Sequence, residues 1–226
     1  GTSISFGSPT VFESATVTTV SATFDSSNNK VVIAYTDDAN SSYGTAIVGT
    51  VSGTSISFGS ATVFESAESN SISATFDSSN NKVVIAYADV GNSTYGTAIV
   101  GTVSGTSISF GSAAVFESAS SQYIAATFDS SNNKVVIAYT DQGNSSYGTA
   151  IVGTVDSSDN SISFGTAAVF ESATADHFAI AFDSNSNKTV IFYRDQGDSN
   201  YGKAVVATVS GTSISFGSVV AFENSE

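Results

Sequence analysis

The stretch Phe24–Tyr35, with the sequence FDSSNNKVVIAY, decides the fold because it returns along the chain at a fixed spacing. It recurs unchanged at Phe76–Tyr87 and Phe128–Tyr139, and with four substitutions at Phe182–Tyr193. The phrase SISFG keeps the same period of 52 residues, with one interval of 54, and begins at Ser3, Ser55, Ser107, Ser161 and Ser213. Such a period is typical of solenoids, propellers and repeat arrays. We therefore predict a single repeat domain over 1–226, with repeats at 1–52, 53–104, 105–158 and 159–210 and a partial closing repeat at 211–226.

Each repeat contains four extended runs, which we call strands a, b, c and d. In the first copy they are Val20–Asp25, Lys30–Thr36, Thr45–Val51 and Ser55–Phe64. The runs are rich in Val, Ile, Thr, Phe and Tyr, whereas the spacers between them are rich in Gly, Asn, Asp and Ser. These are the residue preferences of strands and turns, and no stretch shows helical periodicity. The chain is therefore predicted to be all-β.

The two faces of each strand indicate where it lies in a sheet. Strand b carries apolar residues on both faces, which indicates burial on both sides. Strand d alternates Ile4 and Phe6 with serines, which predicts that one of its faces is buried and the other is exposed to solvent. Strand a carries small residues such as Ser21 and Ala22, which suit a crowded axis. This order predicts a β-propeller of four-stranded antiparallel blades, with a β-solenoid or an open repeat array as the alternative.

The strand count leaves one strand d in surplus. There are five copies of strand d but four copies of strands a, b and c, and the extra outer strand is Gly1–Phe12. The surplus strand is either redundant, or part of a longer array, or able to complete a blade of a neighbouring subunit. The chain contains no Met, which favours a mature chain or a segment of a longer protein. A homo-oligomer joined through this strand is one expectation.

Composition excludes several classes of function. With 20 acidic and 6 basic residues the net charge is −14, so nucleic acid and anionic membrane surfaces are not expected partners. No apolar run approaches the roughly 20 residues that membrane insertion requires. The chain has no Cys and a single His, so thiolate and multi-histidine metal sites are ruled out. We predict a protein that is not an enzyme and has no resident cofactor.

Positions that differ between the repeats cluster in two connections, d-to-a and b-to-c. Because successive strands of a blade run antiparallel, both connections are expected on one face of the propeller. Loops on a rigid scaffold commonly carry recognition. The distinctive side chains at these positions are the candidate ligand-binding residues, namely Gln122, Tyr123, Asp176, His177, Arg194 and Gln196.

Recurrent acidic residues have structural interpretations. Segments such as Asp37–Asn40 resemble calcium loops in composition, but they lack the full D-x-D-x-D-G ladder and the bidentate Glu. Asx-turns explain the same residues, so calcium is kept as an alternative to the absence of a cofactor. One Glu follows a Phe in each repeat and is interpreted as structural or solvating, at Glu13, Glu65, Glu117 and Glu171.

The repeat FDSSNNKVVIAY…YGTAIVGTVSGTSISFGS resembles repeats of large surface-exposed proteins of marine microbes and their viruses, including tail-fibre-like and capsid-decorating proteins. The resemblance implies a non-catalytic propeller at a virion or cell surface, in an extracellular location. Such a protein would recognise a glycan or a host-surface receptor through its variable face, or would decorate or space an assembly of other surface proteins. A neutral sugar suits the acidic chain best. The alternatives are a self-assembling structural repeat joined by strand exchange and a secreted carbohydrate-active enzyme.

Overall fold

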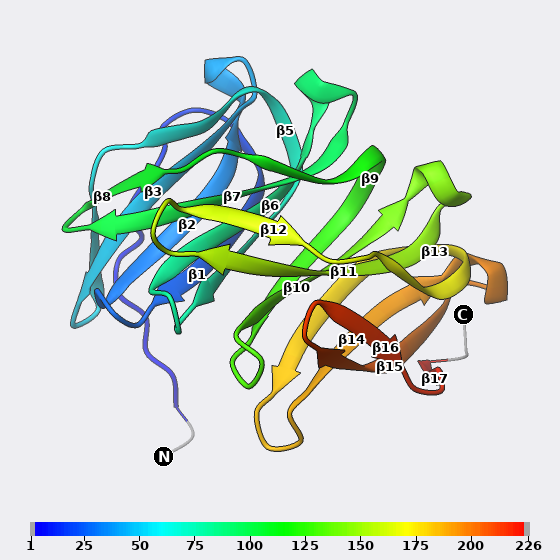
Figure 1. Cartoon of the computed structure of the whole chain (residues 1–226). Coiled ribbons are helices and arrows are strands. Elements are labelled where there is room, and N and C mark those ends of the chain that lie inside the picture. Colours follow the sequence, from blue (N-terminus) through cyan, green and yellow to red (C-terminus); the bar gives the residue numbers. More distant parts are fainter. Residues whose placement is uncertain (1–2, 224–226) are drawn as a thin grey trace.

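The computed structural model describes residues 3–223, which form antiparallel strands joined by tight turns and four short 3-10 turns (Figure 1). The strands group into four sheets that follow one another along the chain, and each sheet is one blade. The prediction of an all-β chain built from four-stranded antiparallel blades is therefore confirmed. The repeat bounds given above remain a choice of phase, since a periodic sequence can be divided at any point of its period.

Blade 1 shows how one repeat becomes a sheet. Its inner strand β1 pairs with β2, and β2 pairs with β3. The outer strand is made of two pieces, β4 and the first part of β5, which pair with opposite ends of β3. The bounds are β1 (Val17–Asp25), β2 (Lys30–Asp37), β3 (Tyr43–Ser52), β4 (Ser55–Phe58) and β5 (Thr62–Asp77).

The other three blades repeat this pattern. Blade 2 consists of the second part of β5, β6 (Lys82–Asp89), β7 (Tyr95–Ser104), β8 (Ser107–Phe110) and the start of β9 (Ala114–Asp129). Blade 3 consists of the rest of β9, β10 (Lys134–Asp141), β11 (Tyr147–Asp156), β12 (Ser161–Phe164) and the start of β13 (Ala168–Asp183). Blade 4 consists of the rest of β13, β14 (Lys188–Asp195), β15 (Tyr201–Ser210), β16 (Ser213–Phe216) and β17 (Val220–Glu223). The 3-10 turns are η1 (Asp38–Asn40), η2 (Val90–Asn92), η3 (Gln142–Asn144) and η4 (Gln196–Asp198).

The predicted d-to-a loops are not loops, and this prediction is wrong. The chain passes from one blade to the next inside a single long strand, as in β5, whose residue Glu65 still pairs with β3 while Ser69 already pairs with β6. The crossing is stabilised locally, because the backbone N–H of Ser69 donates to the carbonyl of Ser42 at 3.1 Å. Continuous strand pairing gives hydrogen-bond partners to backbone N–H and C=O groups that in a loop would have to bind water.

The repeated FD-x₄-K motif forms the turn between the first two strands of a blade. The buried carboxylate of Asp25 accepts hydrogen bonds from the backbone N–H groups of Ser27 and Asn28 at 2.9 and 3.0 Å. Lys30 then donates from Nζ to Oγ1 of Thr50 at 2.9 Å, across the strand pair. An Asp side chain that accepts hydrogen bonds from the following backbone N–H groups forms an Asx-turn. The need for this turn in every blade explains why the motif recurs.

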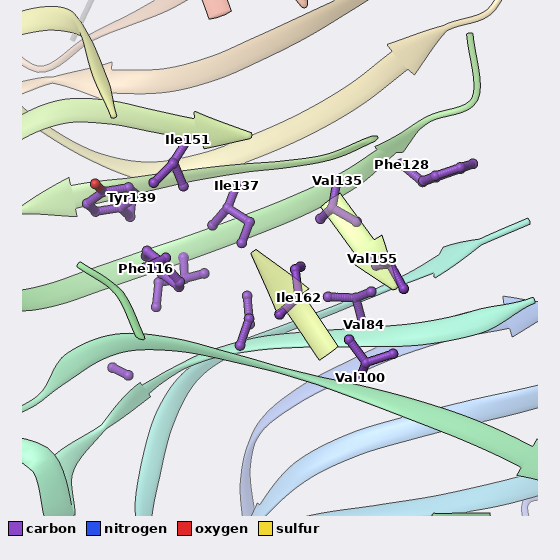
Figure 2. Packing of buried hydrophobic residues seen from close by; sticks show 14 residues of the cluster. Val84, Val100, Phe116, Phe128, Val135, Ile137, Tyr139, Ile151, Val155 and Ile162 are labelled. Atoms are coloured by element: carbon purple, nitrogen blue, oxygen red, sulfur yellow. The ribbon is translucent and has the colours of Figure 1, made fainter. Parts of the chain in front are cut away.

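Apolar layers between neighbouring blades hold the array together. We call the face of a blade that packs on the following blade its C-side face, and the opposite face its N-side face. Between blades 2 and 3 the C-side residues Val84 and Val100 meet the N-side residues Val135, Ile137 and Tyr139 (Figure 2). Equivalent layers lie between blades 1 and 2 and between blades 3 and 4. The prediction that strand b is buried on both faces is confirmed for the interior blades.

In each repeat a hydrogen bond between one tyrosine and one glutamate joins two adjacent strands. Tyr87 donates from its hydroxyl to Glu65 at 3.0 Å, and Tyr139 donates to Glu117 at 3.1 Å. Burial and the facing carboxylate raise the pKa of each tyrosine, to about 12 in the case of Tyr35. The recurrent glutamates therefore have a structural partner, as their repetition indicated.

The array is open at both ends. Among residues 3–223, blade 4 ends at β17, which pairs with β15, and the strand pairings include none between blade 4 and blade 1. The predicted extra outer strand is not formed in the described part, since Ser3–Thr16 belongs to no strand; Gly1 and Thr2 lie outside the described residues. The physical reason is the absence of a partner, because the outer strands β4 and β8 each form against the third strand of their own blade.

Candidate ligand-binding site

A column of variable side chains runs across the inner strands of the four blades. Each inner strand contains a β-bulge at the same position, where the register with the second strand shifts. The bulge gives positive φ angles of 46°, 49°, 51° and 53° to Thr19, Ser71, Tyr123 and His177 respectively. Non-glycine residues rarely adopt this conformation, and bulges are known to redirect side chains near functional sites. The same strained geometry in every blade thus presents a different side chain each time.

The members of the column are neighbours in space. The inner strands of adjacent blades lie side by side, and the backbone N–H of Tyr123 donates to Oγ of Ser71 at 3.2 Å. The rings of Tyr123 and His177 lie with centroids 4.8 Å apart and an interplanar angle of 30°. Both rings are exposed. Blades 3 and 4 therefore share a small aromatic surface that the first two blades lack.

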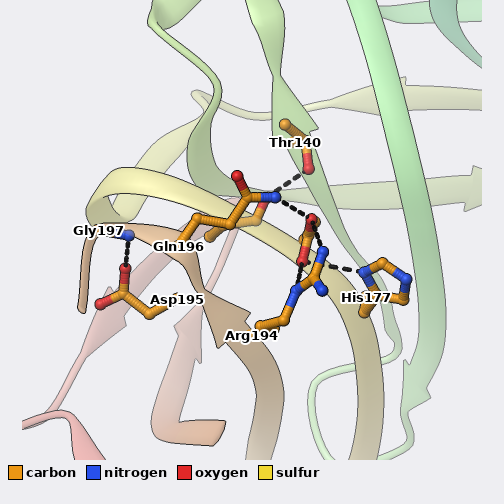
Figure 3. A network of polar contacts seen from close by, with 8 residues as sticks. Thr140, His177, Arg194, Asp195, Gln196 and Gly197 are labelled. Atoms are coloured by element: carbon orange, nitrogen blue, oxygen red, sulfur yellow. Dashed lines mark hydrogen bonds and ion pairs between the residues drawn. The ribbon is translucent and has the colours of Figure 1, made fainter. Parts of the chain in front are cut away.

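A polar cluster lies beside this aromatic pair and is centred on Asp176 (Figure 3). Asp176 is buried, and Arg194 contacts its two oxygens through Nε and Nη2 at 2.8 and 2.7 Å. His177 Nδ1 lies 2.9 Å from the same carboxylate, and Gln196 donates to it from Nε2. The bidentate geometry follows from register, because Asp176 and Arg194 are direct partners of β13 and β14. The cluster is a hydrogen-bonded base beside the exposed rings.

The cluster fixes the charge of its central carboxylate. Burial alone would raise the pKa of Asp176, but the hydrogen bonds from Arg194, His177 and Gln196 outweigh burial and lower this pKa to about 2. The same carboxylate raises the pKa of Arg194. Asp176 is therefore ionised at neutral pH, and its charge is compensated by the guanidinium.

A second ion-pair group lies in the adjoining turn of blade 4. Lys203 contacts Asp195 at 2.6 Å and Asp198 at 2.8 Å, and the backbone N–H of Gly197 donates to Asp195 at 2.8 Å. The two carboxylates raise the pKa of Lys203. Together these contacts fix the turn that carries Gln196. In the other blades a Thr occupies the position of Lys203, so a residue-by-residue comparison of the repeats would have found it.

The structure brings together five of the six residues predicted from the sequence. Tyr123, Asp176, His177, Arg194 and Gln196 form one contiguous site between blades 3 and 4. Gln122 precedes Tyr123 on β9 and lies opposite Thr140, in the positions that Asp176 and Arg194 hold in blade 4. These residues lie on strands and in η4, although the sequence suggested loops for the d-to-a positions.

Sequence reasoning missed Thr140 as well as Lys203. The hydroxyl of Thr140 donates to the carbonyl of Ala175 at 2.6 Å, in a buried hydrogen bond that joins blade 3 to the residue preceding Asp176. Thr36 makes the equivalent bond to the carbonyl of Ser69 between blades 1 and 2. The signal for it was weak, because Thr is common throughout the repeats.

The acidic segments considered for calcium have another role. Asp37, Asp89 and Asp141 each accept a hydrogen bond from the backbone N–H of the Asn three residues later, and so cap the 3-10 turns. Within residues 3–223 no group of three or more His, Cys, Asp and Glu side chains is placed to hold a metal ion. The described part of the chain also encloses no pocket, so the candidate site is an exposed surface. None of its helical segments could span a bilayer.

Comparison with known proteins supports the fold. No family model and no curated protein matches the sequence. Among solved structures, the chain is similar to Sqt1 of Saccharomyces cerevisiae, with a TM-score of 0.54, 14% identity, and coverage of 90% of this chain and 48% of that one. It is also similar to the Aleuria aurantia lectin in complex with α-methyl-L-fucoside, with a TM-score of 0.53, 16% identity, and coverage of 87% and 58%.

Both of these neighbours are β-propellers. The fold is that of a β-propeller. The chain spans about half the length of the structures it matches, in agreement with an arc of blades that does not close. At these identities the likeness concerns the fold alone, and function has to be argued from the site.

Proposed function

We propose that this protein is a non-catalytic binding propeller that recognises a neutral glycan through the surface formed by Tyr123, His177, Arg194 and Gln196. The observation that carries the proposal is the pair of exposed rings, with centroids 4.8 Å apart, set on the hydrogen-bonded base around Asp176. Of the two propeller neighbours, one is a lectin in complex with a methyl fucoside. The likeness to that lectin supports a sugar as the class of ligand, but it does not identify the sugar.

The aromatic pair supplies the apolar part of a sugar site. Aromatic rings present a flat apolar body, and tyrosine adds a polar edge. Blade 1 has Thr19 and blade 2 has Ser71 at the same bulge, so neither offers a comparable surface. The proposed site is accordingly confined to the junction of blades 3 and 4.

The polar cluster supplies directional hydrogen bonding at low entropic cost. Arg194 and Gln196 are held by Asp176, so ligand binding would not have to order them. The unused N–H groups of the guanidinium and the amide oxygen of Gln196 can face hydroxyl groups. A neutral ligand is favoured because the Arg194 charge is already paired within a chain of net charge −14.

The proposal includes a location at a virion or cell surface. It is supported by the resemblance of the repeat to those of surface-exposed proteins of marine microbes and their viruses. Labelling of intact particles or cells with an antibody against the chain would test this part, since labelling that requires permeabilisation would contradict it.

The binding proposal is tested by screening the chain against a panel of neutral glycans, followed by calorimetric titration with the best ligand. We expect Tyr123→Ala to weaken binding by at least about tenfold, since a buried aromatic contact accounts for a large share of such an interaction. The matched control is Thr19→Ala, the same bulge position in blade 1, which should leave affinity unchanged. Incubation with the bound glycan should release no product.

Three results would count against the proposal. They are the absence of any bound neutral glycan at millimolar concentration, equal affinity of the Tyr123→Ala variant and the wild type, and hydrolysis of the ligand. The last result would favour the carbohydrate-active enzyme considered from the sequence.

A further inference from the structure

The two ends of the array expose side chains that the interior blades bury. At the N-side face of blade 1, Val51 is 53% exposed, whereas its counterpart Val103 in blade 2 is 5% exposed. At the C-side face of blade 4, Phe222 is 62% exposed, whereas its counterpart Phe116 is 7% exposed. The exposed apolar residues at the ends also include Phe24, Phe192 and Val206. Within residues 3–223, each end therefore carries one half of an interface that no further blade covers.

The missing half of each interface is known from the interior. Three times in this chain a C-side face packs on an N-side face, with the same kinds of residues in the same positions. In the second of these layers Val84 and Val100 cover Val135 and Ile137 (Figure 2). Blade 4 keeps Val190 and Val206 at the positions of Val84 and Val100, and blade 1 keeps Val31 and Ile33 at those of Val135 and Ile137.

We propose that the C-side face of blade 4 binds the N-side face of blade 1 of a second copy of this chain, head to tail. The occupant that fits best is a second copy because the interior layers show these two types of face to be complementary. The interface is heterologous, so the copies form a closed ring if the rotation closes and an open filament if it does not.

The N-terminal segment Ser3–Glu13 covers part of the face of blade 1 that this docking would use. Phe12 packs edge-on against Tyr35 and Phe58, with centroids 5.3 and 6.0 Å apart, as Phe64 packs on Tyr87 and Phe110 within the array. The segment thus holds the place that the outer strand of a preceding blade would take. Because β16 and β17 are already hydrogen-bonded to β15, we expect this segment to yield when blade 4 of a second copy docks.

Blade 4 differs from the interior blades on this face, and Phe192 is the substitution that bears on docking. Phe192 replaces the Ala at the equivalent position of the other blades, and its ring lies 6.0 Å from that of Phe222. The substitution enlarges the apolar surface of this end. It also makes the interface between copies different in detail from the interior layers.

The test measures mass against concentration by light scattering for the full chain and for matched variants. We expect the wild type to exceed its 22.9 kDa monomer mass as concentration rises. Val206→Asp should weaken association by about 100-fold or more, because the interface would bury an unpaired carboxylate. Val115→Asp is the control, because Val115 is 45% exposed and Val206 44% exposed, but Val115 lies within the array.

A mixing experiment tests the head-to-tail arrangement. Val206→Asp blocks one end and Val51→Asp blocks the other, so each variant alone should remain monomeric. An equimolar mixture should form a 1:1 complex and stop there, because one intact end of each kind remains. Association of either variant with itself would overturn the head-to-tail arrangement.

Exchange of the N-terminal strand is a separate outcome. Ile4 is 77% exposed, whereas its counterpart Ile108 in β8 is 4% exposed, so strand exchange would bury Ile4. Ile4→Asp should leave association by the blade faces intact and would abolish strand exchange. Loss of association in this variant, or a wild type that stays monomeric at millimolar concentration, would overturn the proposal.

The association should also depend on salt. Because every copy carries a net charge of −14, added salt screens the repulsion between copies and should strengthen association.

Discussion

The interior blades 2 and 3 and the end blades 1 and 4 have nearly the same sequence, but their surroundings differ. Val100 in blade 2 is fully buried, whereas Val206 at the same position of blade 4 is exposed. Ile137 in blade 3 is fully buried, whereas Ile33 in blade 1 is half-buried. In this protein the role of a residue therefore depends on whether a neighbouring blade covers it, and identical residues should contribute differently to stability.

The largest effect is expected from truncating the same isoleucine in an interior blade and in an end blade. Ile137→Ala should lower the free energy of unfolding by about 2–5 kcal/mol, because it leaves a cavity between blades 2 and 3. Ile33→Ala should cost about half as much, since water already reaches its face. Chemical denaturation measures both variants, and equal costs would show that end faces are covered in solution.

The glycines of the repeated Tyr-Gly pair give the next contrast. A Cβ atom at Gly96 would lie 2.3 Å from the ring of Phe116, which is buried, whereas at Gly202 it would lie 2.8 Å from the exposed ring of Phe222. We expect Gly96→Ala to cost about 1–3 kcal/mol through overpacking. Gly202→Ala should cost less, because the ring of Phe222 can move aside. Thermal denaturation of the two variants tests this, and a larger loss for Gly202→Ala would contradict the explanation.

The smallest of the three effects concerns pH and sharpens the contrast between blade 4 and blade 2. The pKa of Asp176 is lowered to about 2 in the folded protein, against about 4 for an unfolded Asp. Its ionised form therefore stabilises the fold above about pH 4, and this contribution disappears as pH falls towards 2. Because its partners Arg194 and His177 are partly exposed, we expect about 1–2 kcal/mol at neutral pH.

The measurement is the difference in unfolding free energy between the wild type and Asp176→Asn from pH 6 to pH 2.5. This difference should shrink as pH falls below about 4. Asn70 holds the same position in blade 2 without a charge, so the cost of Asn70→Ala should not change over that range. A pH-independent cost of Asp176→Asn would mean that the carboxylate gains nothing from its partners.

Much of the fold was predictable because the repeat carries its own boundaries. The turn residues around Asp25 and the apolar run Val31–Tyr35 predict strands and their burial, and both are local properties. The crossing from one blade to the next was predicted as a loop, because polar residues such as Ser69 and Asn70 look like turn residues. In the structure both residues pair with β6, whereas Glu65, just before the crossing, pairs with β3. Pairing of this kind depends on distant partners, so local composition could not predict it.

The candidate site was partly predictable for the same reason. The repeats differ from one another at Tyr123, His177 and Arg194, and this difference could be read without any structure. Their proximity could not, since it depends on the register of β13 with β14 and on the bulge that turns each residue of the column outward.

The sequence by itself determined the period, the strands and the identity of the variable residues, because hydrophobic alternation and turn chemistry act over a few residues. The tertiary structure alone decided that the arc stays open within residues 3–223 and that Val206 and Phe222 are exposed. It also decided that Asp176 lies within reach of three partners. These outcomes depend on how blades stack, and stacking brings together residues about 52 positions apart, whose relation no local pattern encodes.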